Sequence, residues 1–200
     1  MSEHTKPEVY VIESLDPNDE GNGRFEGVIL ARILDLHGKR CKYEYVRTKA
    51  QFKSAVKRFG KSGYRYLHIS AHANSDGMRT TNQDDIDFVE FGQILHPHLK
   101  ERRLFVSACR MVHLDLAKAV IPQSGCFSVI GPNEDVYFGD AAILWSSLYH
   151  LMFSHNAEKM QRNELVNFLR QTSKLFQVSM SYFSKSTATP SGVSEDLLEK

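Results

Sequence analysis

The 200-residue sequence predicts an α/β fold in which helices cover both faces of a mainly parallel central sheet. Short apolar runs rich in strand-favouring residues alternate with longer segments whose apolar residues recur at helical spacing. That alternation is typical of strand–helix–strand units, which place successive strands parallel and pack helices on both faces. Two of the apolar runs end on small residues followed by a histidine or a cysteine, as expected where strands deliver reactive groups to one sheet edge.

The first part of the chain predicts two strands and two helices. Residues 8–14 include four consecutive apolar positions, which is typical of a buried parallel strand. Residues 15–24 are dense in turn formers and predict a long loop, and residues 25–37 carry apolar side chains at helical spacing before a glycine. Residues 42–47 alternate tyrosines with charged residues, which predicts a strand, and residues 51–59 present one apolar helical face.

The middle of the chain predicts strands over residues 64–70 and 103–107, separated by a polar excursion. Residues 73–87 are polar and contain glycine, so we expect an exposed loop there. Residues 88–91 suggest a brief extended piece, and residues 92–99 predict a short helix that a proline limits.

The last part predicts a helix over residues 113–120, a fifth strand over residues 126–130 and a loop at the same sheet edge over residues 131–135. Apolar stripes then predict two long helices, over residues 141–153 and 164–183. From about residue 184 the composition turns to Ser, Thr, Pro and Gly. We therefore expect one domain over residues 1–185 and a flexible polar tail over residues 186–200.

Two strand ends carry the residues that point to chemistry. The third predicted strand runs into Ser-Ala-His-Ala, which contains His72, and the fourth runs into Ser-Ala-Cys-Arg, which contains Cys109. Neighbouring parallel strands would bring both tips to one sheet edge, where a thiol and an imidazole can form a nucleophilic pair. His72 would take the thiol proton and later protonate the leaving amine. The backbone N–H groups of Ala73 and Cys109 are the expected donors to the developing oxyanion.

Taken alone, His72 could be an ordinary loop histidine and Cys109 an ordinary buried thiol at the end of a strand. Their matching positions at the ends of successive strands favour a reactive pair over these two separate interpretations. Cys41 and Cys126 each start an apparent strand and are interpreted as small buried thiols, since an odd cysteine count argues against a disulfide framework. His68 lies inside a strand and is interpreted as a hydrogen-bonded core residue. His96 and His98 flank a proline with no third ligand spaced to join them, so we expect no metal site.

The two strand ends resemble those of the caspase-like cysteine peptidases, the group that includes caspases, gingipains, separases and the bacterial CHAT peptidases. The matching stretches are residues 70–73 (Ser-Ala-His-Ala) and 106–110 (Val-Ser-Ala-Cys-Arg), and CHAT peptidases look most similar. The resemblance spans about residues 8–153. It implies a three-layer sandwich and peptide-bond hydrolysis by His72 and Cys109 with no metal or cofactor. Ala73 stands where the group usually has glycine, which would leave the oxyanion donor there less freely oriented.

Loops after the first and fifth strands should wall a substrate pocket, because both leave the sheet at the edge that carries Cys109. They contain one cation, Arg24, and a set of carboxylates: Asp16, Asp19, Glu20, Glu134, Asp135 and, just beyond, Asp140. Several carboxylates around a partly buried cleft favour a basic side chain, Arg or Lys, before the cut bond. Two alternatives stay open: these acids are solvated loop residues, or Arg24 selects an acidic residue.

The overall composition argues against two classes of binding partner, nucleic acids and membranes. A net charge of +1 provides no broad field to attract nucleic acid or an anionic membrane, and no apolar run is long enough to span a bilayer. The polar start lacks a signal-peptide core, so we expect a cytoplasmic protein. The expected partner is a protein or peptide substrate, with an activating protein partner left open.

Three functions fit the sequence. The first is a cysteine endopeptidase, which the presence of both His72 and Cys109 favours. The second is a catalytically inactive caspase-like binding or regulatory module, which the presence of Ala73 in place of the usual glycine favours. The third is an unrelated α/β enzyme that acts on a small ligand at the same sheet edge. Only the first requires a nucleophilic thiolate.

Overall fold

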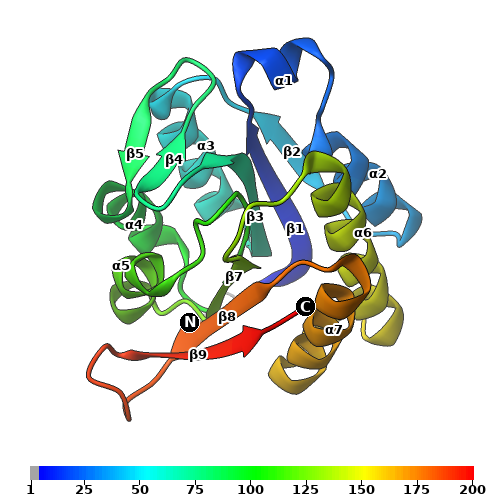
Figure 1. The fold of residues 1–200 in the computed structure, drawn as a ribbon, viewed down its shortest axis with the longest axis vertical. Coiled ribbons are helices and arrows are strands. Elements are labelled where there is room, and N and C mark those ends of the chain that lie inside the picture. The colour runs from blue at the N-terminus through cyan, green and yellow to red at the C-terminus, as the bar shows by residue number, and fades with distance from the viewer. Residues whose placement is uncertain (1–4) are drawn as a thin grey trace.

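The central strands are apolar on both faces, as buried parallel strands must be: Val9, Tyr10, Val11 and Ile12 are each at most 1% exposed. The computed structural model describes residues 5–200 and, within that range, joins nine strands in one sheet (Figure 1). The strands are β1 (Lys6–Ser14), β2 (Lys42–Tyr45), β3 (Tyr64–Ala73), β4 (Gly77–Arg79), β5 (Asp85–Asp87), β6 (Arg103–Ser107), β7 (Ser128–Pro132), β8 (Met180–Lys185) and β9 (Val193–Leu198). The main path runs β2-β1-β3-β6-β7-β8-β9, parallel through β7 and antiparallel beyond it.

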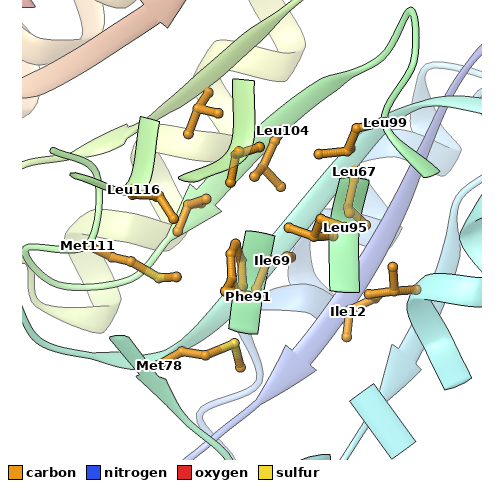
Figure 2. Close-up of a cluster of buried hydrophobic side chains, with 14 of the residues drawn as sticks. Ile12, Leu67, Ile69, Met78, Phe91, Leu95, Leu99, Leu104, Met111 and Leu116 are labelled. Carbon is orange, nitrogen blue, oxygen red and sulfur yellow. The ribbon is translucent and has the colours of Figure 1, made fainter. Parts of the chain in front are cut away.

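Helices cover both faces of this sheet, which confirms the predicted mainly parallel three-layer α/β sandwich. The helices are α1 (Pro17–Gly21), α2 (Glu26–Leu36), α3 (Lys49–Ser62), α4 (Phe88–Leu95), η1 (His96–His98), α5 (Leu114–Ser124), α6 (Phe138–His155) and α7 (Arg162–Phe176). On one face, α3, α4 and α5 share a core with strand residues such as Leu67 and Leu104 (Figure 2). On the other face, α2, α6 and α7 pack around Tyr66, Phe105 and Trp145. Within residues 5–200, no helix combines the length and hydropathy needed to cross a lipid bilayer.

The polar region between β3 and β6 is more structured than the sequence predicts. Residues 88–91 are not extended but open α4, because the side chain of Asp87 caps the helix and accepts the Glu90 N–H at 2.8 Å. The expected loop over residues 73–87 contains β4 and β5, an antiparallel hairpin that continues from the end of β3. The expected loop over residues 15–24 contains the short helix α1.

The last predicted helix is also corrected. It is expected to run to residue 183 but ends at Phe176, because Gln177 adopts a left-handed backbone conformation with φ 56°. The following residues then turn back into the sheet as β8, which pairs antiparallel with β7. The side chains of Met180, Tyr182 and Phe183 are each at most 1% exposed there. Burial against the rest of the core therefore decides between helix and strand for this segment.

The expected flexible tail over residues 186–200 is wrong for most of its length. Residues 193–198 form β9, which pairs with β8 along its whole length. Val193 and Leu198 are 2% and 1% exposed and pack into the cores on opposite faces of the sheet, so the strand is buried at both of its ends. The Ser-, Thr-, Pro- and Gly-rich residues are the hairpin turn between β8 and β9, where Gly192 has φ 75°. The domain therefore includes the C-terminal segment.

Candidate active site

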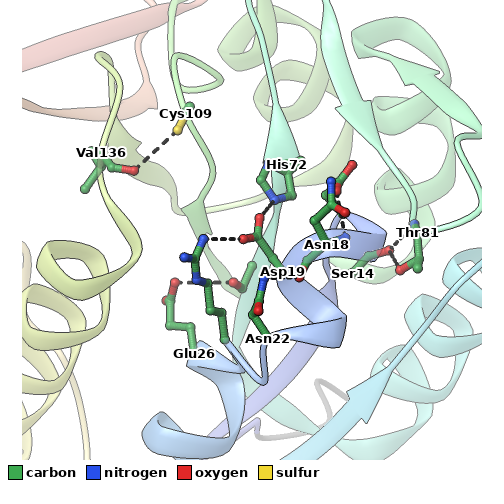
Figure 3. Close-up of polar contacts among 12 residues, drawn as sticks. Ser14, Asn18, Asp19, Asn22, Glu26, His72, Thr81, Cys109 and Val136 are labelled. Atoms are coloured by element: carbon green, nitrogen blue, oxygen red, sulfur yellow. Dashed lines mark hydrogen bonds and ion pairs between the residues drawn. The ribbon is translucent and has the colours of Figure 1, made fainter.

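His72 and Cys109 lie at the carboxyl ends of neighbouring parallel strands. β3 and β6 pair in a register that ends at Ser70 and Ser107, so each reactive residue lies two positions beyond the last pair. Both side chains, together with those serines, line one small cavity of about 40 Å³. The ring of Phe138, from the start of α6, packs edge-on against the imidazole with 5.5 Å between ring centroids. The topology therefore brings the predicted pair to one side of the sheet edge (Figure 3).

The thiol and the imidazole are not hydrogen-bonded to each other in this conformation. Cys109 donates its S–H to the backbone carbonyl of Val136, with 3.6 Å between sulfur and oxygen. Val136 belongs to the segment that connects β7 to α6. The cysteine side chain is half-buried, and it shares its cavity with His72.

A carboxylate on the first loop holds the imidazole. His72 Nε2 lies 2.6 Å from Asp19 Oδ2, and the other oxygen of Asp19 accepts from Arg24 at 2.6 Å (Figure 3). Asp19 is buried, whereas the His72 side chain is 39% exposed. Because the Asp19 carboxylate accepts a hydrogen bond from Nε2–H, the neutral imidazole has its free lone pair at Nδ1. Asp19 can therefore fix the orientation of the ring.

The sequence of the first loop explains how Asp19 reaches His72. Asp16 caps α1 by accepting the Asn18 N–H at 2.9 Å, and Pro17 occupies the first helical position, where a missing N–H costs nothing. This single turn directs Asp19 toward the carboxyl edge of β3. The turn formers in the sequence predict this long loop, and Asp19 is one of the acids in it. No local sequence pattern indicates that Asp19 contacts His72.

The turn after Cys109 is held in an uncommon conformation. Arg110 has φ 54°, which side-chain-bearing residues rarely adopt, and Met111 N–H closes the turn onto Ala108 O at 3.5 Å. Arg110 N–H donates to Glu134 O at 3.1 Å, and its guanidinium pairs with Asp135. The loop after β7 therefore fixes the turn that carries the thiol. Among residues 5–200, the Cys109 N–H itself donates to no backbone carbonyl.

A buried polar network lies directly beneath the pair. The Glu26 carboxylate is 3% exposed and accepts from Ser107 Oγ at 2.8 Å and Ser70 Oγ at 3.3 Å. Its other oxygen lies 3.2 Å from His68 Nε2, and His68 Nδ1 lies 3.0 Å from the Tyr149 hydroxyl. This confirms His68 as a hydrogen-bonded core residue. The sequence held one signal for the network: a serine stands two positions before both reactive residues.

The other two cysteines differ from Cys109 in their surroundings. Cys126 is buried, and burial raises the pKa of its thiol to about 12. Burial, with smaller contributions from Asp35 and Glu8, likewise raises the pKa of Cys41 to about 12. Near neutral pH neither thiol has an appreciable thiolate fraction, and the nucleophilic form is the thiolate.

The acidic residues predicted to wall the pocket have several different roles. Asp16 lines a pocket of about 480 Å³ that borders His72 and Ala73. Glu20 pairs with Arg47 at 2.6 Å, and Asp135 pairs with Arg110. The remaining acids lie on the side of β7 and α6: Glu134 accepts from Lys200 at 2.8 Å and from Ser179 N–H at 2.7 Å, and Asp140 is exposed in the first turn of α6.

Further carboxylates in that pocket come from the β4–β5 hairpin. Asp76, Asp85 and Asp87 line it with Asp16, against one cation, Arg79, which pairs with Asp85 at 2.6 Å. Arg24, the cation expected to compete with these acids, is bound to Asp19 instead. The sequence does not indicate that the hairpin acids line this pocket, because it predicts only an exposed polar loop for the region that contains them. Among residues 5–200, no cluster of three or more His, Cys, Asp or Glu side chains is arranged to hold a metal ion.

No protein-family model matches this chain, and no curated protein sequence matches it. Solved structures do match. The Arg-specific cysteine proteinase gingipain R aligns with TM-score 0.59 and 10% identity over 88% of this chain. A secreted C11 cysteine protease from Bacteroides thetaiotaomicron aligns with TM-score 0.58 and 10% identity over 90%. Caspase-1 from Spodoptera frugiperda aligns with TM-score 0.56 and 12% identity over 98%.

The chain spans 44% of the gingipain chain, 66% of the C11 protease and 85% of the caspase. At these identities the likeness concerns the fold. The alignments cover 88% to 98% of this chain, and the three matched proteins are all cysteine peptidases of caspase-like fold. This chain has the three-layer α/β fold of the caspase-like cysteine peptidases.

Proposed function

We propose that this protein is a cysteine endopeptidase in which Cys109 is the nucleophile, His72 the general base and acid, and Asp19 a positioning residue. One observation carries the proposal: His72 and Cys109 line the same cavity at the edge of adjacent strands, and the imidazole is held by a buried carboxylate. A nucleophile, a base and a group that orients the base are the parts of a nucleophilic hydrolase.

The chemistry follows from these positions. His72 Nδ1 accepts the thiol proton, and the Cys109 sulfur attacks the peptide carbonyl carbon to form a tetrahedral oxyanion. When the carbon–nitrogen bond breaks, the imidazolium gives its proton to the leaving amine. A thioester remains on Cys109. Water, deprotonated by the same imidazole, hydrolyses this thioester to the carboxylate and restores the thiol. No metal or cofactor takes part in these steps.

The thiol must leave the Val136 carbonyl to meet the imidazole. Cysteine has three staggered rotamers about its Cα–Cβ bond, so rotation about that bond redirects the thiol within the cavity that it shares with His72. The present sulfur–oxygen contact of 3.6 Å is a weak hydrogen bond, which a bound substrate can replace.

Two backbone donors are suited to the oxyanion. The Cys109 N–H donates to no carbonyl among residues 5–200. In the β3–β4 ladder, Asn74 N–H donates to Gly77 O at 3.1 Å, so the next pair, Ala73 with Met78, is of the non-hydrogen-bonded kind. The Ala73 N–H is therefore directed away from β4. Donors of this kind stabilise the charge that develops in the transition state.

The pocket of about 480 Å³ beside His72 favours a basic residue before the cut bond. Four carboxylates line it against one guanidinium, and that guanidinium is already paired with Asp85. An Arg or Lys side chain would offset part of this excess negative charge, whereas an Asp side chain would add a fifth carboxylate. The substrate class we propose is therefore peptides with Arg or Lys at that position.

A catalytically inactive caspase-like binding module is the second candidate. Two observations favour it: Ala73 replaces the usual glycine, and the thiol bonds to Val136 rather than to the imidazole. A substrate-like peptide carrying an electrophilic ketone after Arg separates the two candidates, because only a nucleophilic thiolate reacts with it covalently.

We expect the parent protein to gain the mass of one probe at Cys109. Cys109→Ala should gain none, His72→Ala should react far more slowly, and Cys41→Ser should react like the parent. A folded parent protein that remains unmodified by this probe and by its Lys, Leu and Asp counterparts would favour the binding module. Circular dichroism of each variant verifies that the fold is retained.

A further inference from the structure

A separate pocket lies at the opposite edge of the sheet from His72 and Cys109. It has a volume of about 330 Å³ and is formed at the amino ends of β3 and β6 and by the residue before β7. Arg65, Arg103 and Lys159 line it, with Glu101 as its carboxylate and Phe127 as its exposed aromatic ring. The peptidase proposal uses none of these residues.

Arg103 is a buried cation with only neutral partners. It is 9% exposed, and its guanidinium donates to Ser128 Oγ at 2.8 Å, Tyr182 OH at 3.1 Å and Met160 O at 2.9 Å. Within residues 5–200 no carboxylate lies within ion-pair distance of it. Buried charges are normally paired, because removing an ion from water costs several kcal/mol. The pocket therefore presents positive charge that the protein does not neutralise.

The neighbouring cations add to this charge. Arg65 donates to Thr5 Oγ1 at 2.8 Å, Thr5 O at 2.5 Å and Glu158 O at 2.8 Å, all neutral acceptors. Lys159 is exposed at the rim and, among residues 5–200, forms no ion pair. Three cations and the Glu101 carboxylate leave two uncompensated positive charges. A phosphate group at neutral pH carries between one and two negative charges and accepts several hydrogen bonds.

We propose that this pocket binds a phosphate-bearing small ligand. Its volume of about 330 Å³ accommodates a free phosphate and is of the size that holds compact ligands. The Phe127 ring is 47% exposed, and the Arg103 guanidinium lies 5.7 Å from its centroid, so a flat base can stack beside the charged groups. Free phosphate and a nucleotide share this chemistry, and titrations tell them apart.

The test uses the full chain and isothermal titration calorimetry with inorganic phosphate, AMP and adenosine, with the unfolding temperature followed in parallel. We expect phosphate or AMP to bind saturably and to raise the unfolding temperature, and adenosine to do neither. Tighter binding of AMP than of phosphate assigns a nucleotide, and equal binding assigns free phosphate; both outcomes support the proposal. Binding of neither anion, or of adenosine as tightly as AMP, would overturn it.

Arg103→Gln is an unsuitable probe on its own, because Arg103 also bridges β7 and β8 and its loss can unfold the sheet. Lys159→Glu changes a rim residue whose side chain is exposed, and it should weaken AMP or phosphate binding at least about tenfold. Lys57→Glu makes the same charge change on an exposed position of α3 and should leave binding unchanged. Equal binding by these two variants would contradict the assigned pocket.

Discussion

Single residues decide whether the candidate site can act. Asp19 is the clearest example, because it is buried and contacts the one nitrogen of His72 that the proposed proton transfer does not use. Its second oxygen is held by Arg24, so the carboxylate has little freedom. A base that is fixed in one orientation and one tautomer does not need to change its rotamer before it accepts the thiol proton.

Asp19→Asn tests this role. The amide keeps the shape of the carboxylate but loses its charge, so we expect kcat to fall roughly 10²-fold with little change in KM. Steady-state kinetics on an Arg-containing peptide measures both constants. Asp35→Asn, an exposed position on α2, serves as the matched control. An Asp19→Asn variant that retains the parent kcat would show that the ring needs no carboxylate.

Thiol alkylation distinguishes the three cysteines without any substrate. We expect iodoacetamide near pH 7 to label Cys109 before Cys41 and Cys126, because burial raises the pKa of the latter two to about 12. Peptide mass spectrometry at successive times gives the three rates. In guanidinium chloride all three should react at similar rates, which provides the control. Equal rates in the folded protein would argue against a distinct Cys109 thiol.

At the scale of secondary-structure elements, β1 carries a buried acid that couples stability to pH. Glu13 is fully buried and accepts from Gly27 N–H at 2.9 Å and Tyr43 OH at 2.8 Å. Burial raises its pKa from 4.5 to about 7. The folded state therefore holds this proton more tightly than the unfolded state. The resulting stability is fully present below about pH 4.5 and is lost as the pH rises through about 7.

Glu13→Gln should remove this dependence. A rise of about 2.5 in pKa corresponds to about 3 kcal/mol in the free energy of unfolding between the two pH limits. Urea unfolding of parent and variant at pH 5 and pH 8 measures the difference, and we expect the variant to lose less stability on going to pH 8. Glu8→Gln, on the same strand, is the control. Identical pH slopes for Glu13→Gln and the parent would refute the assignment.

The pairing of β9 makes the C-terminal segment part of the fold. Leu198 is 1% exposed in the core beside α7, whereas its neighbour Leu197 is 52% exposed. We expect Leu198→Ala to lower the free energy of unfolding by about 2–4 kcal/mol, and Leu197→Ala by less than about 0.5 kcal/mol. Chemical denaturation measures both. Two equally neutral substitutions would mean that β9 is frayed in solution.

At the scale of the whole molecule, the acidic pocket depends on segments that meet only in the folded state. Asp16 follows β1, and Asp76, Asp85 and Asp87 come from the hairpin that continues β3. A peptide library should therefore show enrichment of Arg and Lys before the cut bond. Asp76→Asn should weaken that preference several-fold, because the exposed Asp76 carboxylate adds to the field of the pocket. Enrichment of Asp with exclusion of Arg and Lys would refute the proposed pocket.

The sequence by itself determined where along the chain the five parallel strands lie and which two strand ends carry His72 and Cys109. Both follow from local signals, namely apolar runs, helical spacing and small residues before a reactive side chain. Only the tertiary structure decided that Asp19 contacts His72 and that Glu26 joins Ser70 and Ser107, because these partners are separated by 44 to 81 positions in the chain. The same holds for β9. Its residues form a strand because β8 offers an open edge and the core offers space for Leu198, and local composition records neither.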